Sequence, residues 1–149
     1  SIFTTETQRH RDWKVNGKVM ETGPVINGDD PLTSAIIGGA IEVHRALGPG
    51  LLESVYEECL AHELDERGLK VQRQVPLPVV FKGKRLDCGY RIDMIVNDSV
   101  LLELKAIEKV LPVHEAQLLS YLKLSGKKVG LLLNFHVAYL KDGITRRIL

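Results

Sequence analysis

The hydrophobic period of this chain changes near Gly68, and that change limits the folds that are open to it. Between residues 32 and 67, apolar side chains recur every three or four positions, which predicts two helices. From Val71 to Phe81, and again from Leu86 to Val96, they alternate as in strands. A helical segment is therefore followed by a sheet.

The remaining segments extend this pattern. The stretch "VLLELKAI" at 100–107 predicts a strand, and "VGLLLNF" at 129–135 is typical of a strand that is covered on both faces. Residues 113–125 between them have helical spacing, and Asp142-Gly143 predicts a last hairpin between "HVAYL" and "ITRRIL". We expect the order α-α-β-β-β-α-β-β, an α/β fold in which helices flank a mixed sheet. Pro76 and Pro78 predict that the first strand lies at an edge.

Capping residues and glycines predict where the two N-terminal helices begin and end. Thr33 can cap the first helix, and Gly38-Gly39 within it would let another backbone approach closely. The turn Gly48-Pro49-Gly50 ends it. We expect the second helix to run from about Leu51 to Arg67, where Gly68 provides a stop signal.

Residues 1–31 are polar and weakly patterned, so we expect an extended N-terminal arm ahead of a domain that spans 32–149. Their turn signal is Asn16-Gly17, which predicts a small hairpin, and Trp13 is their candidate anchor. Because the arm has too few apolar residues to fold alone, we expect it to lie on another surface, such as a second copy of the chain in a homo-oligomer.

Charge and composition narrow the classes of function. The formal net charge is +1, so a nucleic-acid partner would have to meet a local basic patch. Aromatic residues make up 5% of the chain, which argues against a long base-stacking platform. No apolar run approaches a membrane span, no secretory signal is visible, and Cys59 and Cys88 lack metal-type spacing. We therefore expect a cytoplasmic protein without a membrane partner.

The triplet Glu103-Leu104-Lys105 carries the clearest chemistry. Its two charged side chains are two positions apart in a predicted strand, so they share one face. Acidic-x-Lys triplets also arise by chance, and a half-exposed strand with a solvated ion pair explains this one equally well on its own. Asp93, on the polar face of the preceding strand, favours a site.

The turn between these strands decides whether Asp93 and Glu103 meet. A three-residue turn at 97–99 would pair them directly, whereas a two-residue turn at 97–98 would put them on opposite faces. Paired like charges repel, so a fold that keeps them needs a reason, and a hard divalent cation such as Mg²⁺ supplies one. Lys105 could then orient or help to deprotonate a metal-bound water and oppose phosphate charge.

These residues carry a family resemblance. Asp93 followed by Glu103-Leu104-Lys105 on the next strand resembles the PD-(D/E)XK nuclease superfamily, although Ile92 replaces the proline before Asp93. The stretch "GLLESVY" at 50–56, within "IEVHRALGPGLLESVYEECL", resembles the GxxExxY family of that superfamily. The resemblance covers residues 32–149. It implies the superfamily's fold and a metal site formed by Asp93, Glu103 and the main-chain carbonyl of Leu104.

The same resemblance implies that Glu53, on a helix ahead of the sheet, contributes a third carboxylate. The alternative is that Glu53 only stabilises the positive end of its helix, by roughly 0.3–1 kcal/mol. Tyr56 lies on the apolar stripe of that helix, and we expect it to pack in the core, where its hydroxyl needs one partner.

The third predicted helix presents His114, Gln117 and Tyr121 on one face. The pair Gln117-x-x-x-Tyr121 resembles the Gln-x-x-x-Tyr motif of RecB-like nucleases, which implies that both residues hold the site and contact substrate. A polar helix face explains them equally well. His44 and His114 are either phosphate contacts or ordinary satisfied histidines. The candidates for binding nucleic acid are His114 and the basic residues near the first hairpin, which otherwise form a solvated face: Lys82, Lys84, Arg85 and Arg91.

We therefore expect a Mg²⁺-dependent nuclease, with Mn²⁺ as a substitute, that hydrolyses phosphodiester bonds in nucleic acid, with DNA as the expected substrate. Lys105 would position the attacking water, and Gln117 and Tyr121 would support the site. The alternative is a non-catalytic nucleic-acid-binding or assembly subunit that keeps the fold. Loss of a key carboxylate or lysine would mark that alternative, and none is lost here.

Overall fold

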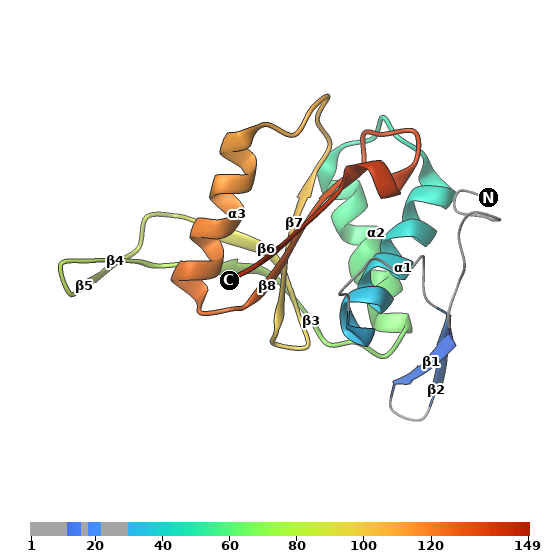
Figure 1. The fold of residues 1–149 in the computed structure, drawn as a ribbon, viewed down its shortest axis with the longest axis horizontal. Helices are drawn as coiled ribbons and strands as arrows, with labels where there is room; N and C mark the ends of the chain where they lie inside the picture. Colours follow the sequence, from blue (N-terminus) through green and yellow to red (C-terminus); the bar gives the residue numbers. More distant parts are fainter. Residues whose placement is uncertain (1–11, 16–17, 22–29) are drawn as a thin grey trace.

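The computed structural model describes residues 12–15, 18–21 and 30–149. In that part of the chain, three α-helices surround a five-stranded sheet (Figure 1). In chain order the elements are β1 (Asp12–Val15), β2 (Lys18–Glu21), α1 (Pro31–Leu47), α2 (Glu53–Glu66), β3 (Val71–Pro76), β4 (Val79–Phe81), β5 (Lys84–Leu86), β6 (Arg91–Val96), β7 (Val100–Lys105), α3 (Pro112–Ser125), β8 (Val129–Asn134), the 3₁₀-helix η1 (Leu140–Gly143) and β9 (Ile144–Ile148).

The five-stranded sheet is mixed, with the order β3-β6-β7-β8-β9. Strands β7 and β8 run parallel, and the other neighbours run antiparallel. Helix α3 connects the two parallel strands, because a parallel pair needs a crossover connection. Strand β3 lies at an edge, as its prolines predicted. The predicted α/β class is confirmed.

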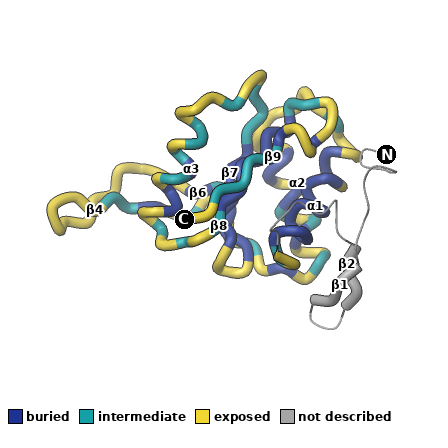
Figure 2. The backbone as a smooth tube through the Cα atoms, viewed as in Figure 1, coloured by how far each residue is buried: buried dark blue, intermediate teal, exposed yellow. Residues whose placement is uncertain are grey.

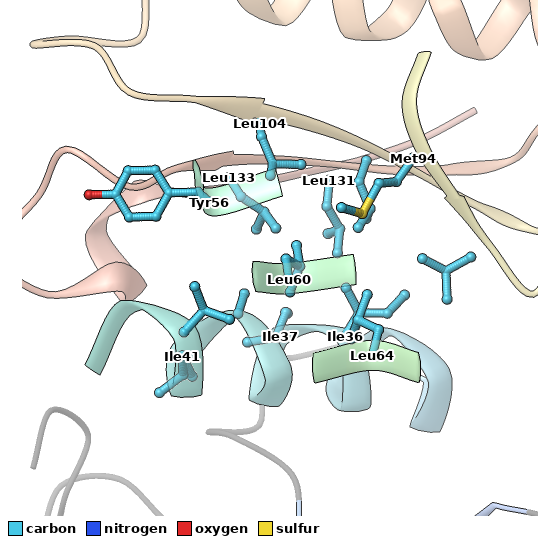
Figure 3. Close-up of a cluster of buried hydrophobic side chains, with 14 of the residues drawn as sticks. Ile36, Ile37, Ile41, Tyr56, Leu60, Leu64, Met94, Leu104, Leu131 and Leu133 are labelled. Carbon is cyan, nitrogen blue, oxygen red and sulfur yellow. The ribbon is translucent and has the colours of Figure 1, made fainter. Parts of the chain in front are cut away.

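Helices cover both faces of this sheet. Helices α1 and α2 lie on one face and α3 on the other (Figure 1). The α3 side is closed by Leu118 and Leu122, which pack with Leu101 of β7. The opposite side holds the larger cluster (Figure 3), whose labelled members are Ile36, Ile37, Ile41, Tyr56, Leu60, Leu64, Met94, Leu104, Leu131 and Leu133. Because β7 alternates, Glu103 and Lys105 share the α3 face with Leu101.

Helix α1 is buried along most of its length (Figure 2). Its cap is Asp30 and not Thr33: the Asp30 Oδ1 accepts the Thr33 N–H at 2.7 Å. A Cβ added at Gly39 would lie 2.8 Å from Cδ2 of Leu64 in α2, so this glycine makes room for a side chain, whereas the approach of another backbone was expected. In α2, Tyr56, Leu60 and Leu64 are buried as expected. Leu52 is exposed, because it precedes the helix.

Two predicted strands are each divided in two. The first breaks into β3 and β4 at Pro78, which cannot donate a backbone hydrogen bond. The second breaks into β5 and β6 where the Asp87 carboxylate accepts the Gly89 N–H at 2.9 Å and Gly89 adopts a φ of +79°. Strands β4 and β5 pair only with each other and form a separate hairpin.

The predicted C-terminal hairpin is wrong. Strand β9 pairs with β8 instead of with residues 136–139, which form no strand. Gly143 instead lies close to β8: a Cβ on Gly143 would overlap the main-chain oxygen of Asn134. A residue with a side chain would not fit there, so the glycine serves packing and not a two-residue turn.

The N-terminal segment contains the predicted hairpin. Strands β1 and β2 pair antiparallel with Val15 opposite Lys18, across Asn16-Gly17. The anchoring role expected for the Trp13 side chain lies outside the described residues, and the role of residues 1–31 in assembly stays a prediction. None of the helices that the structure describes is long and apolar enough to cross a membrane.

Candidate active site

The turn between α1 and α2 is held by Tyr56. Its hydroxyl donates to the carbonyl of Gly48 at 2.6 Å and accepts the N–H of Leu51 at 3.1 Å. Its ring is fully buried and stacks on Phe135, with the ring centroids 4.5 Å apart. The expectation that Tyr56 packs in the core is confirmed. Because both ends of the turn are tied to one side chain, the start of α2, and with it Glu53, has a fixed position.

Strands β6 and β7 are joined by the three-residue turn that would bring the two carboxylates together. Val96 lies opposite Val100 and Met94 opposite Leu102, so the same register places Asp93 opposite Glu103. Asn97 and Asp98 supply the turn with φ values of +50° and +55°, a conformation that these two residue types tolerate. The two carboxylates therefore share one face.

At Asp93 and Glu103, side-chain hydrogen bonds replace the regular backbone pairing of β6 with β7. The pairing of β6 with β7 stops at Met94 and Leu102. Beyond it, the Asp93 N–H donates to Oε2 of Glu103 at 3.0 Å, and the Leu104 N–H donates to Oδ2 of Asp93 at 2.8 Å. Each carboxylate thus holds the other strand, and the peptide of Leu104 is anchored beside both.

The carboxyl groups are difficult to ionise. Burial, together with the charge of Asp93, raises the pKa of Glu103 to about 8, and its side chain is only 5% exposed. Burial also raises the pKa of Asp93, and the charge of Glu57 adds to this effect. For Glu53, burial raises the pKa first and the charge of Asp93 second. These mutual effects indicate that Glu53 of α2 lies within electrostatic range of the two sheet residues.

Lys105 supplies the opposing charge. It is half-buried at the end of β7, and it lowers the pKa values of Glu53, Asp93 and Glu103 against the effect of burial. Its neighbour in β8 is Asn134. The buried Asn134 amide bonds both backbone groups of Ile107, with Nδ2 to the carbonyl at 2.9 Å and Oδ1 to the N–H at 3.1 Å, so it holds the chain that leaves the site.

Helix α3 brings Gln117 and Tyr121 to the same place. Gln117 Nε2 donates to the Tyr121 hydroxyl at 3.2 Å. Tyr121 is buried, and burial together with the charge of Glu103 raises the pKa of its hydroxyl. The ring of Tyr90 meets that of Tyr121 edge to face, with the centroids 5.9 Å apart.

A fourth carboxylate was missed by the sequence interpretation. Glu57, one turn after Glu53, is buried and affects the pKa of both Glu53 and Asp93. Arg73 Nε donates to Glu57 Oε2 at 3.1 Å, and Gln74 Nε2 donates to Oε1 at 2.7 Å. Gln74 has a φ of +49°, and the β3–β6 ladder is interrupted where it would face Asp93. Only the i, i+4 spacing of Glu53 and Glu57 could have indicated this group from the sequence.

The basic candidates occupy a different region. Lys82, Lys84 and Arg85 lie on the exposed β4–β5 hairpin, which projects from the main sheet (Figure 1). Arg91 begins β6 and donates to the carbonyl of Tyr90 at 3.1 Å. His114 lies at the start of α3.

The two histidines have structural partners. His114 Nδ1 accepts the Leu111 N–H at 2.9 Å and so helps to cap α3. His44 is buried, and its Nε2 lies 2.8 Å from the carbonyl of Val137, which favours a structural role over a phosphate contact.

The cluster suits a hard divalent cation, because the side chains of Glu53, Asp93 and Glu103 all offer carboxylate oxygens as ligands. In the described part of the chain, no three acidic, histidine or cysteine side chains already surround one point. Each backbone bond occupies one oxygen, Oδ2 of Asp93 and Oε2 of Glu103, so the second oxygen of each carboxylate is the candidate ligand. The raised pKa values mean that such a cation would relieve repulsion in this cluster.

Comparison with known proteins gives one result that covers most of the chain. A family model described as the PD-(D/E)XK nuclease superfamily matches residues 30–147. No curated protein and no solved structure matches significantly. The matched segment contains every described element from α1 to β8 and nearly all of β9, and so contains the whole carboxylate cluster. The chain therefore belongs to the PD-(D/E)XK nuclease superfamily.

Proposed function

We propose that this protein is a Mg²⁺-dependent nuclease of the GxxExxY family that hydrolyses phosphodiester bonds in DNA. The observation that carries the proposal is the mutual electrostatic coupling of Glu53, Asp93, Glu103 and Lys105, which come from α2, β6 and β7. Glu103 is buried and Asp93 is half-buried beside one lysine, and such a pair of carboxylates costs stability unless it has a task. The chain belongs to a nuclease superfamily, so we infer that the task is cleavage of nucleic acid.

Three carboxylates and one main-chain oxygen would hold the metal: Asp93, Glu103 and Glu53, with the carbonyl of Leu104. The bond from Asp93 to the Leu104 N–H keeps that peptide beside the carboxylates. When bound, Mg²⁺ would act as a Lewis acid on the phosphate and lower the pKa of a coordinated water. Mn²⁺ would serve in the same way, because it has a similar preference for oxygen ligands.

Lys105 would act on the attacking water and on the phosphate. Its ammonium group carries three donors, so it can orient a water and oppose the charge that develops on the phosphate oxygens. Gln117 and Tyr121 would keep the α3 side of the site in place, and their hydrogen bond leaves the amide oxygen of Gln117 available to substrate or water.

The nucleic acid would approach over Lys82, Lys84, Arg85, Arg91 and His114. The four lysine and arginine charges suit a phosphate backbone, and all five residues lie outside the carboxylate cluster, where anion binding would not compete with the metal. The free cysteines Cys59 and Cys88 support a reducing, cytoplasmic setting.

The test combines cleavage with metal binding. Full-length protein is titrated with Mg²⁺ or Mn²⁺ in the presence of plasmid DNA, and calorimetry measures metal binding separately. We expect metal-dependent cleavage. Lys105→Ala should abolish cleavage while metal binding persists, because a cation in the site opposes the metal. Lys109→Ala, which removes a nearby exposed lysine, is the matched control and should cleave normally.

A second variant tests the ligands. The double variant Asp93→Asn, Glu103→Gln should lose Mg²⁺ binding by calorimetry. Equal binding by the double variant and the wild type would overturn the assignment of these ligands. Absence of cleavage of DNA by a wild-type protein that binds Mg²⁺ would instead favour a non-catalytic nucleic-acid-binding or assembly subunit.

A further inference from the structure

The β4–β5 hairpin and the loop after it form an exposed and basic segment of the protein. Every residue from Val80 to Arg91 is exposed, and the hairpin extends away from the rest of the sheet (Figure 2). Between Val79 and Arg91 the chain has four basic residues and one acidic residue, a net charge of +3, whereas the whole chain carries +1. The remainder of the protein is therefore slightly acidic, and the positive charge is concentrated on this segment.

Apolar and basic side chains alternate at the tip of the hairpin. Phe81 is 60% exposed although it is a large aromatic residue. Lys84 lies opposite Phe81 in the hairpin register, so both side chains are on the same face. The Lys82 ammonium lies over the Phe81 ring, 5.5 Å from its centroid. An exposed ring is thus flanked by two cations.

Tyr90 links this segment to the carboxylate cluster. Its side chain is 45% exposed, and its ring rests edge to face against Tyr121, which feels the charges of Glu103 and Asp93. Its carbonyl accepts the Leu77 N–H at 2.9 Å and the Arg91 guanidinium at 3.1 Å, so the backbone at Tyr90 is fixed. A second exposed aromatic ring therefore stands between the hairpin and the site.

We propose that this segment binds one unpaired strand of nucleic acid, with Phe81 and Tyr90 stacking on bases and the four basic side chains contacting the phosphates between them. The bases of a duplex stack on each other and hide their faces, whereas a single strand offers each base to an aromatic ring. Two rings suffice for this contact, and a long platform is not needed. The binding of a single strand does not depend on the proposed function. Only the further step, in which the bound strand is cleaved at the carboxylates, rests on it.

The binding test uses the full-length protein in EDTA, so that cleavage plays no part. Fluorescence anisotropy compares an oligothymidylate with a mixed-sequence duplex of the same length. We expect the single strand to bind more tightly. Tyr90→Ala should weaken its binding by about fivefold or more, and Tyr90→Phe should restore it, because stacking needs the ring and not the hydroxyl. Tyr139→Ala, which removes another half-exposed tyrosine from a loop beside α1, should bind like the wild type.

The charge test uses matched double variants. Lys82→Glu with Lys84→Glu should weaken binding and reduce its salt dependence, since fewer counterions are released. Lys70→Glu with Lys128→Glu changes the charge equally, at the strand ends remote from the site, and should have little effect.

Cys88 lies between the hairpin and Tyr90 and is exposed, so bound oligonucleotide should slow its alkylation, with Cys59 in α2 as the internal reference.

Any one of these results would overturn the inference: no binding of the oligothymidylate, equal or tighter binding of the duplex, wild-type affinity of Tyr90→Ala, or unprotected Cys88. Self-association that is lost in the Lys82→Glu, Lys84→Glu variant, without strand binding, would assign the segment to a contact between copies and would also overturn it. A protein that binds the strand as described but does not cleave with Mg²⁺ leaves this inference standing and removes the proposed function. Mg²⁺-dependent cleavage that is insensitive to Tyr90→Ala leaves the proposed function standing and overturns this inference.

Discussion

At the scale of single residues, Glu103 shows how strongly its surroundings change a carboxyl group. Its pKa is about 8 because it is buried and faces Asp93, whereas the ordinary value is 4.5. At neutral pH the metal-free protein therefore keeps a proton on Glu103 that the unfolded chain has released. A cation would have to displace this proton, so metal binding and pH are coupled.

This coupling predicts an unusual pH dependence of stability. The contribution of Glu103 is fully present below pH 4.5 and is lost as pH rises through about 8, so the free energy of unfolding in EDTA should fall across that window. One pKa unit corresponds to about 1.4 kcal/mol, which sets a ceiling of a few kcal/mol. The shifts of Asp93 and Glu53 have the same sign. Urea unfolding at several pH values measures the effect.

The control is Glu103→Gln, which keeps an oxygen for the Asp93 N–H but cannot ionise. It should flatten the decline and exceed the wild type in stability near pH 8.5. Glu108→Gln, at an exposed position, should follow the wild type. A Glu103→Gln protein with the wild-type pH dependence would contradict the raised pKa.

Glu53 tests whether a residue serves its helix or the site. If it only stabilised the start of α2, Glu53→Gln would cost at most about 1 kcal/mol and leave metal affinity unchanged. We expect the opposite pattern: stability unchanged or slightly higher, because repulsion from Asp93 is relieved, and metal-dependent cleavage lower by roughly 10–100-fold. Melting curves and cleavage rates measure the two effects. Asp65→Asn in the last turn of α2 is the control, and wild-type cleavage by Glu53→Gln would return Glu53 to a capping role.

At the scale of elements, the turn between α1 and α2 determines where Glu53 begins its helix. Tyr56→Phe would keep the ring stacked on Phe135 but leave the Gly48 carbonyl and the Leu51 N–H without their partner. Leu51 is exposed and Gly48 half-buried, so water can replace the hydroxyl, and each lost hydrogen bond costs about 0.5–1.5 kcal/mol. We expect a loss of that order in urea unfolding. Calorimetry should also show weaker Mg²⁺ binding, since the position of Glu53 loosens.

Tyr139→Phe removes a hydroxyl from a half-exposed ring and is the matched control. Its stability and metal affinity should equal those of the wild type. A Tyr56→Phe variant that is destabilised but binds Mg²⁺ normally would show that the turn does not control the site.

At the scale of the whole molecule, the domain and the N-terminal segment should separate. Asp30 caps α1, and the family match also begins at residue 30, so a chain without residues 1–28 keeps the cap and all five strands of the sheet. We expect it to melt cooperatively with a midpoint close to that of the full chain. If residues 1–31 mediate assembly, light scattering should show a smaller particle. Loss of cooperative melting would show that the segment belongs to the domain.

The sequence by itself determined the parts of this protein that depend on neighbouring residues. The hydrophobic period indicated the helices and the central strands, because burial of one face repeats along each element. The sequence narrowed the register of Asp93 and Glu103 to two turn lengths, because a hairpin's register follows from the length of its turn. The structure selected the three-residue turn Asn97-Asp98-Ser99. The packing of Tyr56 was predictable for the same local reason.

Only the tertiary structure decided what depends on residues distant in sequence. Glu57 meets Arg73 and Gln74, which are 16 and 17 positions away, and no local spacing indicates that contact. Tyr90 reaches Tyr121 because the second predicted strand breaks at Asp87, and Gly143 avoids a hairpin because it lies against Asn134. The pKa of Glu103 also depends on residues that are distant in sequence. Segments from β6, β7 and α3 together bury this carboxyl group, and its pKa responds to the groups that are close in space, whatever their order along the chain.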